Sequence, residues 1–332
     1  MPAKRRIIYL CIMIVISSFL FFVSGELLVR TFKPQEYFYP RYNFSAQYGL
    51  IPYAGLDITH GVPNSWERIL TVNKYSCRGE PTDISNTYEK NNIVILGDSQ
   101  SFGHGVNDGE EYAVILEQHL GNDFDVINLG SGGWGITQQI RRFYELGQLY
   151  SPKVVILQFS RNDLEDNLVS PVTQIQDGRF IFRDVKPFKL VLKKYLSRSI
   201  LQRSQLYNFF RHRVLTAYND FSFNNNRSTV RKQEAPGADE IIHWNLLELF
   251  AKDLRKRGIN FIMFADSHQL QKYPYLEKKV MELDMKGLCD YQDTFQWDNN
   301  FRDKDYYAPD GHWGVTHHLI IGKRLSEIIN NM

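Results

Sequence analysis

One stretch decides the fold and the chemistry of this chain, and it reads Ile95-Leu96-Gly97-Asp98-Ser99-Gln100-Ser101-Phe102-Gly103-His104. The apolar run Ile93 to Leu96 has the composition of a buried parallel strand, and Gly97 allows a sharp turn where that strand ends. Open α/β sheets place their chemistry outside the carboxyl ends of their strands. Ser99 is therefore the candidate nucleophile.

A lone Gly-Asp-Ser is equally typical of an ordinary strand-to-helix turn. Three further segments lie in the same kind of place, just past an apolar strand or just before a terminal helix. They are Asn128-Leu129-Gly130-Ser131-Gly132-Gly133-Trp134-Gly135, Ser160-Arg161-Asn162-Asp163 and Asp310-Gly311-His312-Trp313. Together with the first stretch they make four ordered blocks.

In these blocks the chain resembles the SGNH (GDSL-type) hydrolase superfamily, and in particular its membrane-anchored bacterial members that modify polysaccharide O-acetyl groups. The resemblance covers roughly residues 72 to 330. It implies an α/β fold of flavodoxin-like topology, a doubly wound parallel sheet with helices on both faces. It also implies a serine esterase or acyl esterase.

The resemblance assigns a role to each block. Ser99 would be the nucleophile, His312 the general base and Asp310 the carboxylate that orients the imidazole. The oxyanion hole would comprise the backbone N–H groups of Ser99 and Gly133 and the side-chain amide of Asn162. These types suit the chemistry, because an imidazole activates a serine hydroxyl and an amide donates without carrying charge.

The last block departs from the common family spacing, since only Gly311 separates Asp310 from His312. Asp305 therefore remains an alternative to Asp310. A turn histidine that caps the final helix is the structural alternative for His312. His317 and His318 fall within the helical pattern that follows, and we interpret them as surface or packing residues.

The N-terminus predicts where the chemistry takes place. Lys4, Arg5 and Arg6 precede an uncharged apolar stretch from Ile7 to Val23, long enough to cross a bilayer. Because positive charge stays in the cytoplasm, everything after Glu26 would face outward. We favour a single-pass anchor in the cell membrane, with an extracytoplasmic catalytic domain. A cleaved secretory signal is the competing interpretation.

The remaining chain divides by composition and pattern. Residues 1–30 form the cytoplasmic tip and anchor, 31–92 a stalk and an irregular or β-rich lead-in, and 93–332 one hydrolase domain with an insert at about 171–237. Apolar strands are predicted at 93–97, 126–129, 154–159 and 259–265. Helices are predicted near 110–120, 136–149, 239–257 and 314–330. This alternation independently indicates a doubly wound parallel sheet.

A basic segment inside the insert carries eight Lys and Arg residues and no Asp or Glu between Lys186 and Arg213. Its aromatic and leucine residues recur at roughly helical intervals, so we expect an inserted helical segment. Three interpretations stay open: a helical cap with a merely solvated basic face, a wall for an anionic glycan, and an interfacial helix against anionic lipid.

Other features exclude more than they establish. The net charge of +2 implies no affinity for nucleic acid. Of the three cysteines, Cys11 lies in the apolar stretch, and Cys77 and Cys289 are treated as free although they could pair. No spacing suggests a metal or cofactor site, and we expect none.

The resulting hypothesis is a Ser-His-Asp esterase acting on an acylated cell-envelope glycan. The residues do not distinguish a hydrolase from a transferase. A catalytically silent glycan-binding or assembly protein and a membrane-surface lipase are the alternatives, and the oligomeric state stays open.

Overall fold

The computed structural model describes residues 3–36, 42–80, 84, 90–160, 162–169, 171–185, 203–211, 213–214, 236–265, 270–293 and 307–332. The chain forms two compact units. The first comprises Met1–Pro40, His60–Glu67 and Tyr195–Arg231, and the second comprises Arg41–Thr59, Arg68–Lys194 and Lys232–Met332.

A five-stranded parallel sheet forms the centre of the second unit, with the strand order β11-β10-β7-β5-β6. Its strands are β5 (Asn91–Leu96), β6 (Phe124–Asn128), β7 (Val154–Phe159), β10 (Asn260–Ala265) and β11 (Asp290–Asp293). Taken in chain order this is the flavodoxin-like order 2-1-3-4-5, as the sequence predicted. The order reverses between β5 and β7, so the crevice outside their carboxyl ends is the expected ligand site.

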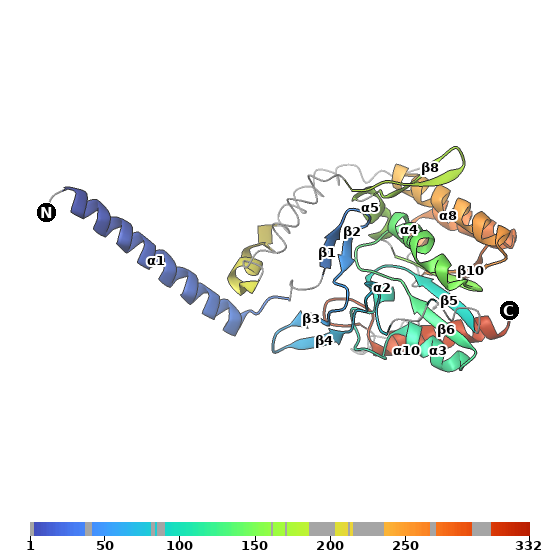
Figure 1. Ribbon diagram of the computed structural model, residues 1–332, viewed down its shortest axis with the longest axis horizontal. Helices are drawn as coiled ribbons and strands as arrows, with labels where there is room; N and C mark the ends of the chain where they lie inside the picture. Colours follow the sequence, from blue (N-terminus) through green and yellow to red (C-terminus); the bar gives the residue numbers. More distant parts are fainter. Residues whose placement is uncertain are drawn as a thin grey trace. The chain divides into compact units, whose positions relative to one another are not determined.

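Helices cover both faces of this sheet (Figure 1). Ile93 and Ile95 of β5 pack in one core with α3 (Tyr112–Leu120) and α10 (Val315–Asn330). The alternate residues Val94 and Leu96 pack in the other core, because successive side chains of a strand point to opposite faces. That second core includes residues of α4 (Ile136–Glu145), α8 (Ala238–Lys256) and α9 (Pro274–Met285). The predicted doubly wound architecture is confirmed.

The element boundaries agree closely with the predicted ranges, with three differences. The predicted helix at 136–149 is α4 followed by a 3-10 turn, η2 (Gly147–Tyr150). Edge strand β11 and helix α9 were not predicted. The described part of this unit also contains the short helical segments α2 (Ser99–Phe102), α5 (Asn162–Val169) and η4 (Leu270–Lys272).

The lead-in is β-rich, one of the two forms that its composition allowed. It contains the strands β1 (Tyr42–Ser45), β2 (Gly49–Pro52), β3 (Ile58–Val62) and β4 (Trp66–Leu70). β1 and β2 pair antiparallel, with Tyr42 opposite Pro52. Cys77 and Cys289 are buried free thiols, as expected. His317 and His318 are buried packing residues rather than surface residues.

The insert begins with a hairpin, which the sequence did not predict. Strands β8 (Thr173–Gln176) and β9 (Arg179–Phe182) pair antiparallel there. Much of the basic segment, residues 186–202, lies outside the described residues. Its described part is helical at 205–211, which agrees with the expected helical segment.

The first unit contains the helix α1 (Ala3–Phe32), which is long and apolar enough to cross a membrane; a signal sequence has the same properties. The Glu26 carboxylate of α1 accepts hydrogen bonds from the Ser204 hydroxyl at 2.7 Å and from the backbone N–H groups of Gln205 and Leu206 at 3.0 and 2.9 Å. This side chain therefore caps helical residues 205–211, because a carboxylate satisfies N–H groups that a helix leaves unpaired at its start.

Candidate active site

Ser99 is the first residue of α2, directly after β5. The side chain of Asp98 caps this turn by accepting a hydrogen bond from the backbone N–H of Gln100 at 2.8 Å. A Cβ on Gly97 would lie 2.1 Å from the Ser101 hydroxyl oxygen, so only glycine permits this close approach. Ser99 is half-buried, so part of its surface is open to solvent at the carboxyl end of the central strand.

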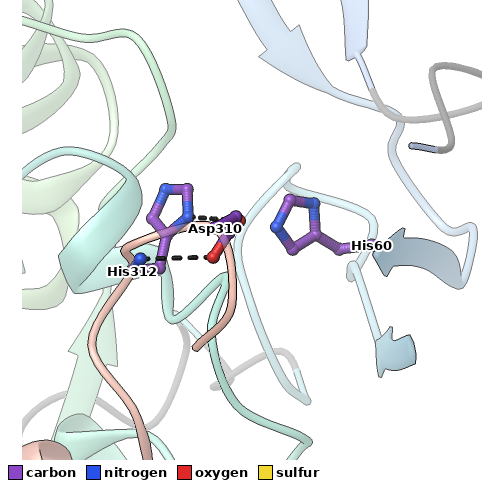
Figure 2. A group of neighbouring side chains, drawn as sticks. All are labelled: His60, Asp310 and His312. Atoms are coloured by element: carbon purple, nitrogen blue, oxygen red, sulfur yellow. Dashed lines mark hydrogen bonds and ion pairs between the residues drawn. The ribbon is translucent and has the colours of Figure 1, made fainter. Parts of the chain in front are cut away.

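His312 lies on the loop before α10, where Asp310 contacts it twice (Figure 2). Asp310 Oδ2 is 2.7 Å from His312 Nδ1, and Oδ1 accepts from the backbone N–H of His312 at 3.2 Å. This is the contact expected of an orienting carboxylate, and it leaves Nε2 as the ring nitrogen for proton transfer. Asp310 and His312 are residue types that can bind a metal ion, but Asp310 Oδ2 and His312 Nδ1 already form a hydrogen bond with each other. Asp305, the alternative to Asp310, lies outside the described residues.

The turn that carries Ser99 and the loop that carries His312 are in direct contact. Gln100 Oε1 accepts a hydrogen bond from the backbone N–H of Trp313 at 2.8 Å. A Cβ on Gly105 would lie 2.1 Å from the Trp313 carbonyl oxygen, so the two backbones touch there. The structure thus brings the first and last sequence blocks together.

The glycine-rich block, residues 130–135, lies against the same turn. The backbone N–H of Leu129 donates to the Ile95 carbonyl at 2.9 Å, and that of Ser131 donates to the Gly97 carbonyl at 3.2 Å. These bonds extend the β5–β6 pairing beyond the strands. Gly133 has a φ of +73°, a left-handed conformation that favours glycine. It is exposed, and its role as an oxyanion donor stays a prediction.

Asn162 begins α5, just beyond the carboxyl end of β7. The block therefore lies just past an apolar strand, as the sequence indicated, and that strand is paired with β5. The Asn162 side chain is exposed, and its Nδ2 donates to Asp166 Oδ2 at 3.0 Å. One N–H of the amide is thus bonded to a carboxylate, and a substrate oxyanion would need the second N–H.

Three carboxyl groups with raised pKa values surround Asn162. Burial raises the pKa of Asp98, which also receives hydrogen bonds from Ser160 and Asn162. Burial, reinforced by the negative charge of Asp98, raises the pKa of Asp163 well above its usual range. Burial likewise raises the pKa of Asp166. Such clustering of perturbed carboxyls is typical of functional sites.

Several residues around the site were not assigned by the sequence blocks. Arg78 is buried and donates to the backbone carbonyls of Phe102 and Val106, each at 3.0 Å, so it braces the segment that follows Ser99. Within this segment, Gln100 accepts a hydrogen bond from the backbone of Trp313, and His104 forms one with the Tyr42 hydroxyl. Their roles depend on contacts between distant parts of the chain, and the sequence offers no spacing that would reveal them.

The four blocks meet at the switch point of a flavodoxin-like sheet, in the order serine, glycine, asparagine and histidine. No protein-family model matches the chain, and no curated protein matches it in sequence.

Solved structures similar to this chain include esterases that share 11 to 13% sequence identity with it. The psychrotrophic esterase EstA from Pseudoalteromonas sp. is 12% identical, with 73% of this chain and 98% of that chain covered and a TM-score of 0.43. An acetyl xylan esterase is 13% identical, with 72% and 99% covered and a TM-score of 0.43. The aryl esterase of M. smegmatis is 11% identical, with 73% and 99% covered and a TM-score of 0.40.

Proposed function

We propose that this chain is a serine esterase of the SGNH type that removes or transfers O-acetyl or other short acyl groups on a cell-envelope polysaccharide. One observation carries the proposal. Ser99 stands on a capped turn at the carboxyl end of β5, and this turn is hydrogen-bonded to the loop on which Asp310 orients His312. These contacts support a nucleophile, a base and an orienting carboxylate at the edge of the sheet where ligands bind.

The mechanism follows from these contacts. Asp310 holds Nδ1 of His312, so Nε2 takes the proton of Ser99 as the hydroxyl oxygen attacks the acyl carbon. The tetrahedral intermediate then collapses, and His312 returns the proton to the leaving alcohol. Water or a sugar hydroxyl attacks the acyl-enzyme in the second half and gives its proton to His312. The second tetrahedral intermediate then collapses, the bond between the acyl carbon and the Ser99 oxygen breaks, and His312 returns the proton to Ser99. Attack by water gives hydrolysis, and attack by a sugar hydroxyl gives acyl transfer.

The negative charge that develops on the acyl oxygen needs hydrogen-bond donors. The backbone N–H groups of Ser99 and Gly133 and the amide of Asn162 are the donors that we assign. Removing one such donor typically lowers turnover on the order of a hundredfold to a thousandfold.

The cellular location is part of the proposal. The first turn of α1 carries the basic residues Lys4, Arg5 and Arg6, and the uncharged apolar stretch from Ile7 to Val23 follows them in the same helix. We propose that it is retained as a single-pass anchor and that the catalytic domain lies outside the cytoplasm, where a cell-envelope glycan is accessible.

The test uses the full-length chain purified in detergent. Release of acetate from para-nitrophenyl acetate is measured with and without an acceptor glycan and compared with the Ser99→Ala variant. Release that depends on Ser99 supports the acyl-enzyme, and diversion of acetyl to the glycan identifies a transferase. Preference for long-chain para-nitrophenyl esters would favour a lipase instead.

Covalent labelling provides a readout that needs no natural substrate. A fluorophosphonate should label wild-type protein at Ser99 and leave Ser99→Ala unlabelled. A wild-type protein that neither labels nor releases acetate would contradict the esterase and favour a silent glycan-binding protein.

A further inference from the structure

His104 ends the stretch that carries the nucleophile, yet the proposed mechanism gives it no role. Its side chain is almost completely buried. The backbone N–H of His104 donates to the Ser99 carbonyl at 3.2 Å, and the centre of its ring lies 5.4 Å from that of His312. A second imidazole therefore stands beside the proposed base, fixed to the turn of the proposed nucleophile.

The partner of His104 comes from the lead-in. The hydroxyl of Tyr42, on strand β1, forms a hydrogen bond with His104 Nε2. The two rings are 5.9 Å apart and tilted relative to each other. A residue 62 positions upstream of His104 thus reaches the segment that follows Ser99.

The same hydroxyl touches the glycine-rich block. A Cβ on Gly132 would lie 2.2 Å from the Tyr42 hydroxyl oxygen and 3.1 Å from His104 Nε2. Real Cβ atoms do not approach other atoms so closely, so this position requires glycine. The Tyr42 hydroxyl therefore lies against the residue that directly precedes Gly133, the expected oxyanion donor.

The hairpin that carries Tyr42 is fastened to this block. Trp134 Nε1 donates to the Leu50 carbonyl on β2 at 2.7 Å. The Tyr48 ring stacks on the Trp134 ring with 4.9 Å between centroids. Because β1 and β2 pair along their whole length, these contacts also hold Tyr42.

We propose that the Tyr42 hydroxyl is a further hydrogen-bond donor to the acyl carbonyl oxygen of the substrate, beside the backbone N–H of Gly133, and that His104 is its positioning residue. The proposal rests on the esterase function proposed above. In it, His104 donates from Nε2 to the Tyr42 oxygen and fixes its place, and the Tyr42 hydroxyl donates to the substrate. A neutral phenol stabilises a developing oxyanion without adding charge. Such a donor complements Asn162, whose amide also serves Asp166.

Tyr42→Phe removes only the hydroxyl, so it is the direct test. In full-length protein we expect kcat for para-nitrophenyl acetate to fall on the order of a hundredfold, with KM changed by less than about threefold. The rate of fluorophosphonate labelling at Ser99 should fall in parallel, because the phosphonyl oxygen occupies the same donor site. Tyr275→Phe, on helix α9, is the matched control and should behave as wild type in both assays.

His104 is tested through its dependence on Tyr42. His104→Gln places an amide N–H near the position of Nε2 and should retain most activity, whereas His104→Phe should lose as much as Tyr42→Phe. The double variant Tyr42→Phe/His104→Phe should be no worse than Tyr42→Phe alone, since the histidine acts through the hydroxyl. A purely structural histidine would instead lower activity further in the double variant.

A second variant tests the same hydroxyl without changing Tyr42, so the result does not depend on whether Tyr42→Phe folds. Gly132→Ala keeps both side chains but displaces the hydroxyl, and it should lower the labelling rate by a similar factor. If wild-type protein and Tyr42→Phe are labelled at Ser99 equally fast, this inference is wrong and the proposed esterase function is unaffected. Wild-type protein that does not label at all overturns both.

Discussion

The backbone N–H of Trp313 donates to Oε1 of Gln100 at 2.8 Å. Gln100 directly follows Ser99, and Trp313 directly follows His312, so one hydrogen bond joins the neighbours of the two residues that we expect to exchange a proton. Proton transfer requires its donor and acceptor to lie within hydrogen-bond reach. This bond therefore sets the spacing of the proposed nucleophile and base.

Replacing Gln100 by leucine should loosen that spacing without removing any group that takes part in the chemistry. We expect Gln100→Leu to lower kcat on the order of tenfold to a hundredfold, because small displacements of catalytic groups have effects of that size. Gln118→Leu, an exposed position on α3, is the control. Steady-state hydrolysis of para-nitrophenyl acetate is the measurement, and an unchanged kcat would show that the contact is dispensable.

Asp310 should be important for turnover, because its carboxylate is hydrogen-bonded to Nδ1 of His312. Asp310→Asn keeps the size of the side chain but removes its negative charge and can place an amide N–H against Nδ1, so the imidazole is free to adopt the wrong tautomer. We expect kcat to fall on the order of a thousandfold or more. Asp305→Asn is the comparison that decides between the two carboxylates. If Asp305→Asn shows the larger loss, the assignment of Asp310 is wrong.

The sheet and its covering helices could be predicted because their residues follow simple periods. The apolar runs at β5 and β7 and the helical spacing in α8 and α10 are local signals. Strand β11, with the sequence Asp290-Tyr291-Gln292-Asp293, lies at an edge and lacks an apolar run. Helix α9 did carry a signal that was overlooked: Leu276, Val280 and Leu283 recur at helical spacing and are buried.

The site could be predicted only where its residues form blocks. Ser99, Gly133, Asn162 and His312 lie in short recognisable segments, and the structure places each segment at the same edge of the sheet. Gln100 and Trp313 are 213 positions apart in the sequence, so no local spacing predicts their contact. Contacts of that kind are set by the tertiary fold and become visible only in the structure.

Gly105 should be essential for the fit of the last block against the first. A Cβ there would lie 2.1 Å from the Trp313 carbonyl oxygen, and backbone cannot move aside cheaply. We expect Gly105→Ala to destabilise the fold by about 1 to 3 kcal/mol, as overpacking does, and to reduce activity. Thermal unfolding monitored by tryptophan fluorescence measures the first effect.

Gly121→Ala is the comparison for Gly105→Ala. Its added Cβ meets no atom within 4 Å, but its φ of +86° and ψ of −171° lie in a region almost restricted to glycine, so it reports the cost of backbone strain without a clash. A Gly105→Ala variant no less stable than Gly121→Ala would argue against close packing of the two segments.

Acid should destabilise this fold through its buried histidines. Burial lowers the pKa of His243 to about 3 and lowers that of His318 well below its usual range. Below an unfolded-state pKa of about 6.5 the unfolded chain binds protons that the folded chain does not, so stability falls as pH falls toward the folded-state values. For His243 alone the loss by pH 3 is on the order of 5 kcal/mol.

The measurement is the free energy of unfolding as a function of pH. His243→Gln can still accept a hydrogen bond from Asn167, the partner of His243 Nδ1 at 3.2 Å. We expect this variant to lose less stability between pH 6.5 and 3 than wild type does. Equal slopes for the two proteins would show that His243 stays protonated in the folded state or titrates normally.

Glu26 should hold the described part of the insert on α1, because its carboxylate accepts three hydrogen bonds from Ser204, Gln205 and Leu206. Losing a helix cap typically costs about 1 kcal/mol, which corresponds to roughly a fivefold larger opened population. In full-length protein, Glu26→Ala should therefore speed tryptic cleavage at Arg203 and Arg211 by about that factor, since cleavage follows the opened fraction when opening is fast. Glu36→Ala is the control for removing a nearby negative charge. Equal cleavage rates in Glu26→Ala and Glu36→Ala would mean that the cap does not hold the segment, and the basic insert would then need another explanation for its place beside α1.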